Sequence, residues 1–226
     1  MNNKTLTALF AAVGRRYGYE ETTAEFAAFR DFKIKWTRSP RWISFEVSDY
    51  LSDAPERVMT SMAVTIFDRI KGEEAKAYDD EVSEWITSDE FVRSKQPLFV
   101  RRFRGLSRGT AGESRDDLAD SYERLIDCGL VERDPDIYIG WAGANRSLRV
   151  ARSSVLMKVV AMSDLLDDDG VPEDVLDYCL YTQLAHIGMG FNPFSDRRGP
   201  EYDALLSRFP GRPSMESYLR GKGMYV

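Results

Sequence analysis

Two segments of the chain carry apolar residues at the spacing of a helix. Apolar side chains that recur every three or four residues share one helix face, which can then pack on other elements. In the first segment these residues are Val58, Met62, Ile66 and Ile70. In the second segment they are Val175, Cys179, Leu184 and Ile187. The pattern predicts two amphipathic helices, each with a buried face.

Candidate strands precede both helices in the same order. If the two halves are copies of one unit, Trp36 and Trp141 take equivalent positions in the first strand of each copy. The residues that read as strands are 34–36 and 42–51 in the first half, and 139–141 and 159–166 in the second.

The turns between these strands and the helices also repeat. Ser-Asp-x-Leu occurs at 48–51 and 163–166, and Pro-Glu-x-Val follows at 55–58 and 172–175. Proline is tolerated in the first turn of a helix because its missing N–H has no partner there. An acidic residue beside it favours the helix dipole. The repeated order indicates an internal duplication.

A further helix is expected before each pair of strands, from Thr23 to Phe32 and from Asp116 to Cys128. Gly129 is typical of a helix C-cap. The order helix, antiparallel strands, helix then occurs twice. The sequence therefore predicts an α+β fold of two tandem units, packed together or across a dimer.

The boundary between the two units is expected in a glycine-rich stretch. A helical run over residues 73–92 leads into residues 101–112, which contain three glycines and no apolar period. We therefore expect units at residues 1–112, linker included, and 113–226.

Composition places the chain among globular proteins. It has 226 residues, of which 43% are apolar, and its formal net charge is −6. Two cysteines are too few for a disulfide framework, so Cys128 and Cys179 are expected to be buried free thiols. No segment reaches the roughly 20 apolar residues of a membrane span. These features predict a cytoplasmic protein without membrane contact.

The helix over residues 175–187 and its continuation through Arg198, Glu201 and Phe209-Pro210 carry a family resemblance. The stretch from Ile137 to Pro210 resembles the core of the SprT/WSS-type zinc metallopeptidases. In that family a strand and a polar turn precede a helix with His-Glu-x-x-His, and a third histidine follows downstream. The resemblance implies that both units are zincin-like.

This chain departs from the family at the positions that carry its chemistry. Thr182 and Gln183 stand where the first histidine and the glutamate would be, and Arg198 where the third histidine would be. His186 alone is retained. A neutral hydroxyl is a poor zinc ligand and an amide cannot accept a proton as a carboxylate can. We therefore expect a pseudo-metallopeptidase with a binding or scaffolding role, without a bound cofactor.

The first half lacks the ligands entirely. In the same register Thr65 and Ile66 occupy the His-Glu pair and Arg69 occupies the second histidine. The parallel between Thr65 and Thr182 favours duplication more than catalysis.

An alternative is an atypical metal-dependent hydrolase that uses His186 with a nearby carboxylate. Glu201, Asp196 and Asp203 are the candidates. Cys179 is seven residues before His186, about 10.5 Å along a helix, which is too far to share one ion. A structural role for this histidine, hydrogen-bonded at a partly buried helix end, competes with both interpretations.

A second alternative is association with nucleic acid through a basic loop, although an exposed loop paired with the protein's own acidic surface is the favoured explanation. Otherwise the partner is unknown, and a protein partner or a second copy of the chain is compatible with the sequence. The basic residues of this nucleic-acid candidate loop are Arg101, Arg102, Arg104, Arg108 and Arg115, with Phe99 and Phe103 interleaved.

The acidic run Asp167–Gly170 lacks the ligand order of a calcium loop and is interpreted as a solvated turn.

Overall fold

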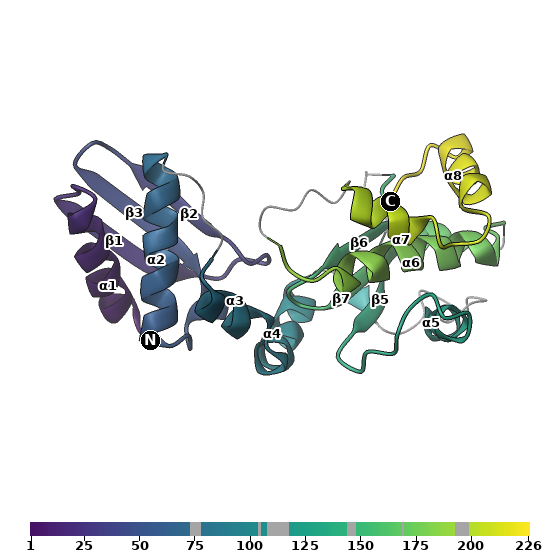
Figure 1. Ribbon diagram of the computed structural model, residues 1–226, viewed down its shortest axis with the longest axis horizontal. Coiled ribbons are helices and arrows are strands. Elements are labelled where there is room, and N and C mark those ends of the chain that lie inside the picture. The colour runs from purple at the N-terminus through teal and green to yellow at the C-terminus, as the bar shows by residue number, and fades with distance from the viewer. Residues whose placement is uncertain (73–77, 104, 108–117, 144–147, 169, 193–198) are drawn as a thin grey trace. The chain divides into compact units, whose positions relative to one another are not determined.

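The chain folds into two compact units, Met1–Phe91 (unit 1) and Val92–Val226 (unit 2). Figure 1 shows the computed structural model. The structure describes residues 1–72, 78–103, 105–107, 118–143, 148–168, 170–192 and 199–226. The division falls between Phe91 and Val92, earlier in the chain than the expected boundary at Gly112, which lies outside the described residues.

Unit 1 consists of a helix, three strands and two further helices. Its elements are α1 (Asn3–Arg16), β1 (Glu21–Ala27), β2 (Ile34–Arg38), β3 (Trp42–Ser48), the 3-10 turn η1 (Asp49–Leu51), α2 (Glu56–Lys71) and α3 (Asp80–Thr87). The helix α4 (Asp89–Arg102) crosses the division between the units.

The sheet of unit 1 is mixed, which corrects the expected antiparallel arrangement. Its strand order is β1-β3-β2, with β1 parallel and β2 antiparallel to β3. A parallel pair cannot be joined by a tight turn, so the chain needs a crossover between its members. Here β2 provides that crossover, and a hairpin then brings β3 back between the two edge strands.

Helices α1 and α2 cover one face of this sheet. Phe45 of β3 contacts Phe10 of α1 and Phe67 of α2, with ring centroids 4.8 and 5.3 Å apart. Gly14 of α1 allows a close approach to β1, because a β-carbon there would lie 2.4 Å from Thr22 Oγ1. The aromatic contacts and the glycine together fix how α1 sits on the sheet.

Unit 2 contains more helices and strands than unit 1, arranged around a second mixed sheet. They are β4 (Leu106–Ser107), α5 (Leu118–Asp127), β5 (Tyr138–Ala142), β6 (Ala151–Ser154), β7 (Val159–Ser163), η2 (Asp164–Leu166), α6 (Glu173–Gly188), α7 (Pro200–Leu206) and α8 (Arg212–Gly221). The strand order is β4-β5-β7-β6, with β5 parallel and β6 antiparallel to β7.

The two units follow the same path from α1 to α2 and from α5 to α6. In each, a parallel strand pair, an antiparallel edge strand, a 3-10 turn and a 16-residue helix occur in the same order. The match extends to single hydrogen bonds, since Ser48 N donates to Lys33 O and Ser163 N donates to Val150 O. Both helices begin directly after a proline, Pro55 and Pro172.

Three details of the sequence prediction are wrong. Trp36 lies in the antiparallel edge strand β2, whereas Trp141 lies in β5, the counterpart of β1, so the two tryptophans are not equivalent and the duplication is not supported in the register that the sequence predicted. The first half of the helix expected from Thr23 to Phe32 lies in the strand β1, whose first residues are alternately exposed and buried. The N-terminal helix α1, capped by Asn2, was not anticipated because its apolar residues are outnumbered by small and polar ones.

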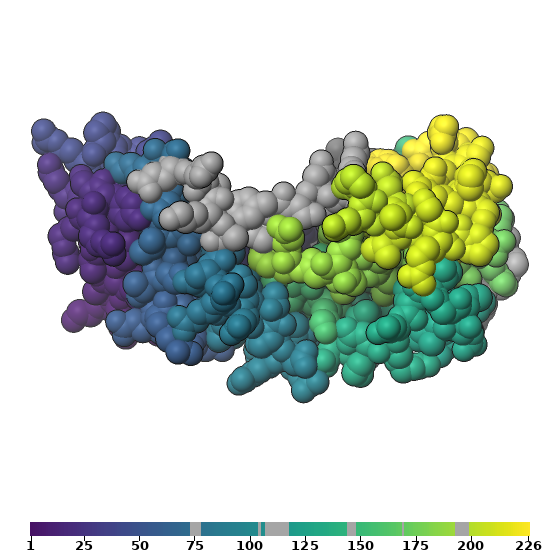
Figure 2. All heavy atoms as spheres, in the orientation of Figure 1, coloured from purple at the N-terminus to yellow at the C-terminus, as the bar shows by residue number. Residues whose placement is uncertain are grey.

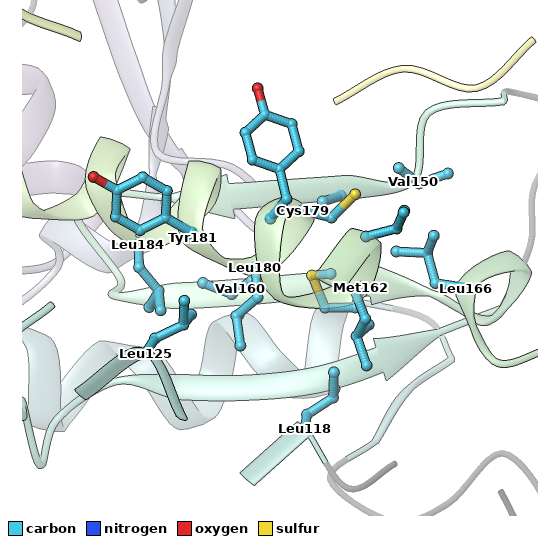
Figure 3. Packing of buried hydrophobic residues seen from close by; sticks show 14 of the residues in the cluster. Leu118, Leu125, Val150, Val160, Met162, Leu166, Cys179, Leu180, Tyr181 and Leu184 are labelled. Atoms are coloured by element: carbon cyan, nitrogen blue, oxygen red, sulfur yellow. The ribbon is translucent and has the colours of Figure 1, made fainter. Parts of the chain in front are cut away.

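The core of unit 2 forms around α6, which is buried on nearly all sides. Figure 3 shows Leu180 and Leu184 of this helix in one cluster with Val160 of β7 and Leu125 of α5. A helix that is apolar around its whole circumference is expected to be enclosed by other elements. Here β6, β7, α5, α7 and α8 enclose it.

No helix in the described ranges has the length and apolarity needed to cross a lipid bilayer. The prediction of two buried thiols is correct for Cys179 and wrong for Cys128, which is exposed just after α5. The helix α5 ends one residue before Cys128, and Gly129 takes the left-handed conformation expected of a C-terminal glycine.

Candidate functional site

The retained histidine lies on α6 beside two buried polar residues. Thr182 and Gln183 are 1% and 3% exposed, and His186 is half-buried one turn further along. The helix begins after Pro172 with two acids in its first turn, as the sequence predicted. The three polar side chains therefore face the interior of unit 2 or its margin, among apolar neighbours.

A serine from the edge strand completes this group. Ser153 of β6 has its Oγ 2.9 Å from Gln183 Oε1 and 3.0 Å from His186 Nδ1. Gln183 Nε2 donates to Thr182 Oγ1 over 3.0 Å, and Thr182 in turn donates to the carbonyl of Cys179 over 2.7 Å. We refer to Ser153, Thr182, Gln183 and His186 as the α6 polar network.

The proton positions in the network follow from its donors. The single hydroxyl proton of Thr182 is given to Cys179 O, so Thr182 can only accept from Gln183 Nε2. The amide oxygen of Gln183 then faces Ser153 and accepts its proton. In the tautomer with a proton on Nδ1, His186 completes this pattern by donating to Ser153, whereas in the other tautomer Ser153 would donate to Nδ1.

This direction of donation decides what Ser153 can do. A serine nucleophile must pass its proton to a neighbouring base, usually the lone pair of a histidine nitrogen. With the proton on Nδ1, the hydroxyl of Ser153 points to the amide oxygen of Gln183 and the facing nitrogen of His186 is itself a donor. In that tautomer the pair forms a structural hydrogen bond and is not arranged as a nucleophile and its base.

The network is tied to α7 by a tyrosine. Tyr202 donates its hydroxyl to the carbonyl of Thr182 over 2.9 Å, and its ring meets that of His186 edge-on at 6.3 Å. Tyr181 of α6 donates to Leu205 O over 2.6 Å. These bonds hold α7 on the side of α6 that carries the histidine.

The carboxylates proposed as metal ligands are not gathered at His186. Glu201 is exposed in the first turn of α7, and Asp203 pairs with Arg212 at 3.4 Å. The residues that the structure describes contain no cluster of three His, Cys, Asp or Glu side chains that could hold a metal ion. Asp196 and Arg198 lie outside the described residues.

A second polar cluster anchors α6 to α5. Asp177 is 8% exposed and accepts two hydrogen bonds from Arg124, at 2.7 and 2.8 Å, and one from Ser121 at 2.6 Å. A bidentate arginine and a serine satisfy the lone pairs of a carboxylate that would otherwise be buried without compensation. The Asp177 cluster therefore fixes how α5 lies on α6.

A third cluster joins α6 to α8. Tyr178 and Arg212 both bond to Glu216, at 2.9 and 2.6 Å. Burial, and then the neighbouring Glu216, raise the pKa of Tyr178. Burial of Glu216 favours its neutral form, yet the bonds from Arg212 and Tyr178 leave its pKa below the usual range. Glu216 is thus a stable acceptor that holds α8 against the helix.

Burial also determines the state of the cysteine on α6. Cys179 is fully enclosed, and desolvation raises the pKa of its thiol to about 12. A thiol with such a pKa is protonated at neutral pH and is neither a nucleophile nor a metal ligand.

The matching positions of unit 1 carry no such network. Thr65 repeats Thr182 by donating to a carbonyl of its own helix, that of Ser61 at 3.1 Å. Ile66, which stands opposite Gln183 in the alignment, is part of the apolar core. Arg69, which stands opposite His186, lies over the ring of Tyr78 at 5.0 Å.

The basic loop is described at residues 101–103 and 105–107, and within it Leu106–Ser107 form the strand β4. Arg101 and Arg102 form the last turn of α4, where cations favour the helix dipole. Arg104 and Arg108 lie outside the described residues.

Sequence reasoning missed Ser153, which connects the histidine to the glutamine. Its strand was not recognised, because the segment 151–154 reads Ala-Arg-Ser-Ser and lacks apolar alternation. No family model matches the chain, and the searches of curated proteins and of solved structures found no match either.

Proposed function

We propose that the chain is a non-catalytic binding or scaffolding protein built from two zincin-like units, the second of which retains a degenerate metallopeptidase site. One observation carries this proposal. Thr182 and Gln183 stand at the positions that would hold a zinc ligand and a general base, and both are buried. They hydrogen-bond to each other, Gln183 also bonds to Ser153, and Thr182 also bonds to the carbonyl oxygen of Cys179.

The residues present do not fit a catalytic zinc ion. Such an ion takes three protein ligands and a water molecule. Among the described residues near the network, His186 offers an imidazole, while the Thr182 hydroxyl and the Gln183 amide are neutral and already engaged. Nothing at position 183 can accept a proton from a water molecule.

The first test is the metal content of the purified, untagged protein. We expect zinc far below one ion per chain in the wild type, and no difference in His186→Ala or in Arg69→Ala, the matched change in unit 1. Zinc near one ion per chain that disappears in His186→Ala alone would overturn the proposal.

A second experiment tests the zincin-like scaffold itself. The double change Thr182→His and Gln183→Glu restores both missing residues beside His186. If α6 has the geometry of a metallopeptidase helix, this variant gains zinc affinity, because histidines four residues apart share one helix face. Thr65→His is the control in unit 1. A folded double variant that binds no more zinc than the control would argue against the scaffold.

An atypical metal-dependent hydrolase is the second candidate, and one feature favours it. His186 Nδ1 lies 3.0 Å from Ser153 Oγ, so the tautomer that donates Nδ1–H to this serine would leave Nε2 as the acceptor nitrogen. Metal-bound histidines are commonly oriented by such a bond from their other nitrogen. This candidate predicts zinc lost in His186→Ala and peptide hydrolysis abolished by chelator, whereas the favoured function predicts neither.

A further inference from the structure

The β2–β3 hairpin of unit 1 combines positive charge with exposed tryptophans. From residue 32 to residue 45 the chain has four basic residues and no acidic one, although the whole protein carries a net charge of −6. Trp36 and Trp42 are 46% and 41% exposed, in contrast to the buried Trp141. The basic residues of the hairpin are Lys33, Lys35, Arg38 and Arg41.

The two tryptophans lie on opposite faces of the sheet. Trp36 pairs with Phe45, whose side chain points toward the core, and Trp42 is three residues from Phe45 along β3. Because side chains alternate along a strand, Trp42 points to the outer face. At about 3.4 Å per residue, the two rings are offset by roughly 10 Å along the strands.

The hairpin cations are exposed, and two of them lie over an aromatic ring other than the tryptophans. Lys33 and Lys35 lie over the ring of Phe29, at 4.8 and 4.9 Å from its centre. The Arg41 side chain is 81% exposed, and its contact with Glu20 is long at 3.9 Å. Exposed ion pairs of this kind contribute little to stability, so Arg41 can exchange Glu20 for another anion.

Further cations lie at the same end of unit 1. Backbone N–H groups of Glu20 and Glu21 donate to Arg41 O, which brings the end of α1 to the hairpin turn. Arg38 Nη1 donates to Ile70 O in the last turn of α2. Figure 1 shows the two helix ends and the hairpin at the upper end of unit 1, and Figure 2 shows side chains projecting there. The exposed cations that these helix ends add are Arg15, Arg16 and Lys71.

We infer that this hairpin is a binding surface for single-stranded nucleic acid. Cations that track a phosphate backbone, together with exposed aromatic rings on which bases stack, are the means by which proteins bind single strands. Double helices keep their bases stacked inside and offer no such surface to a tryptophan. Glu25 and Glu46 pair side by side on the outer face of β1 and β3, so the strand is expected along the β2 edge.

The position of the tryptophans favours a flexible strand over a membrane. A flat bilayer surface would meet the ring on one face of the sheet, whereas Trp36 and Trp42 lie on two faces and away from each other. A single strand can pass around the edge strand and reach both. A single-stranded nucleic acid is therefore the partner that best fits a surface with positive charge and an exposed tryptophan on each face of the sheet at its β2 edge.

The test is the binding of a labelled oligo(dT) or oligo(U) of about a dozen nucleotides, measured by fluorescence anisotropy at several salt concentrations. Replacing Arg38 and Arg41 by Gln should lower the slope of log K against log salt by about 1.4, which is 0.7 per lost phosphate contact. Trp42→Ala should weaken binding roughly fivefold or more, and Trp42→Phe should retain most of it. Circular dichroism of each variant confirms that it is folded.

Lys4→Gln at the opposite end of α1 is the control for the loss of charge. Equal weakening by Lys4→Gln and by the arginine changes would overturn the inference, because binding would then reflect general charge. So would an absence of binding by the wild type at low salt. Sedimentation with anionic phosphatidylserine vesicles in the absence of oligonucleotide binding would identify a membrane partner instead and would equally overturn it.

Discussion

Helices α2 and α6 hold the same place in units that follow the same path, yet their surroundings differ. α2 buries one face, whose Phe67 packs on Phe45 of the sheet, and its other face is partly exposed. α6 is enclosed nearly all round, because α5, α7 and α8 cover the sides that the sheet does not. The comparison teaches that a repeated chain path does not determine how much of its central helix is buried.

The difference in burial is accompanied by a difference in chemistry. Where α2 has Ile66 in an apolar core, α6 has Gln183 in a hydrogen-bonded network. A buried polar network stabilises a fold only if all its members are satisfied, and an apolar core is the simpler solution. Unit 1 follows the same chain path without such a network, so the path does not require it. The network of unit 2 is therefore the feature that needs a functional explanation.

The largest expected effect is that of Asp177→Ala, which tests how far unit 2 depends on its polar anchors. Removing one partner of a buried ion pair costs about 3–5 kcal/mol. Arg124 is 36% exposed and can turn to solvent, so we expect the lower end of that range. Denaturant unfolding of unit 2 measures the change. The control is Thr60→Ala at the matching position of α2, and an equal loss there would break the comparison.

A smaller effect is expected from Gly14→Ala, which tests the close packing that unit 1 uses instead. The new β-carbon would lie 2.4 Å from Thr22 Oγ1 and 3.2 Å from Phe67 Cζ, so side chains must shift. We expect a loss of about 2 kcal/mol. Adding Thr22→Ala should restore stability, since it removes the clashing hydroxyl. A double variant no more stable than Gly14→Ala would place the strain elsewhere.

A loss of about 1 kcal/mol is expected from Gln183→Ile, which gives α6 the residue that α2 carries. The change removes the acceptor of the Ser153 hydroxyl and the donor to Thr182, but adds apolar contacts in return. Thermal unfolding of unit 2 is the measurement. Adding Ser153→Ala should recover part of the loss, and a loss that instead grows would show that the network is not a unit.

Local signals in the sequence were sufficient for the helices with strong patterns. The proline starts and the apolar period predicted α2 and α6, and Gly129 correctly marked the end of α5. The predicted order within unit 1 was wrong, because half of its first expected helix lies in β1, but the α+β class followed from the same signals. Such features are encoded within a few neighbouring residues, which is why a single sequence reveals them.

Features that depend on distant residues were not predictable. The strand β6 has little apolar character because it lies at the sheet edge, where pairing with β7 replaces burial as its main stabilisation. Ser153 was therefore missed, and with it the proton arrangement around His186. The equivalence of Trp36 and Trp141 failed for a related reason, since each half contains a third strand that has no strong pattern.

The two cysteines give the last and smallest expected effect, because it concerns reactivity and leaves stability unchanged. Cys179 lies inside unit 2, where burial raises the pKa of its thiol to about 12, whereas Cys128 is exposed after α5. The thiolate is the reactive form, so a disulfide reagent at pH 8 should label one thiol in the folded protein and two in denaturant. Cys128→Ser should abolish labelling of the folded protein. If Cys179 were labelled as fast as Cys128, α6 would open readily in solution, and its enclosure would no longer distinguish it from α2.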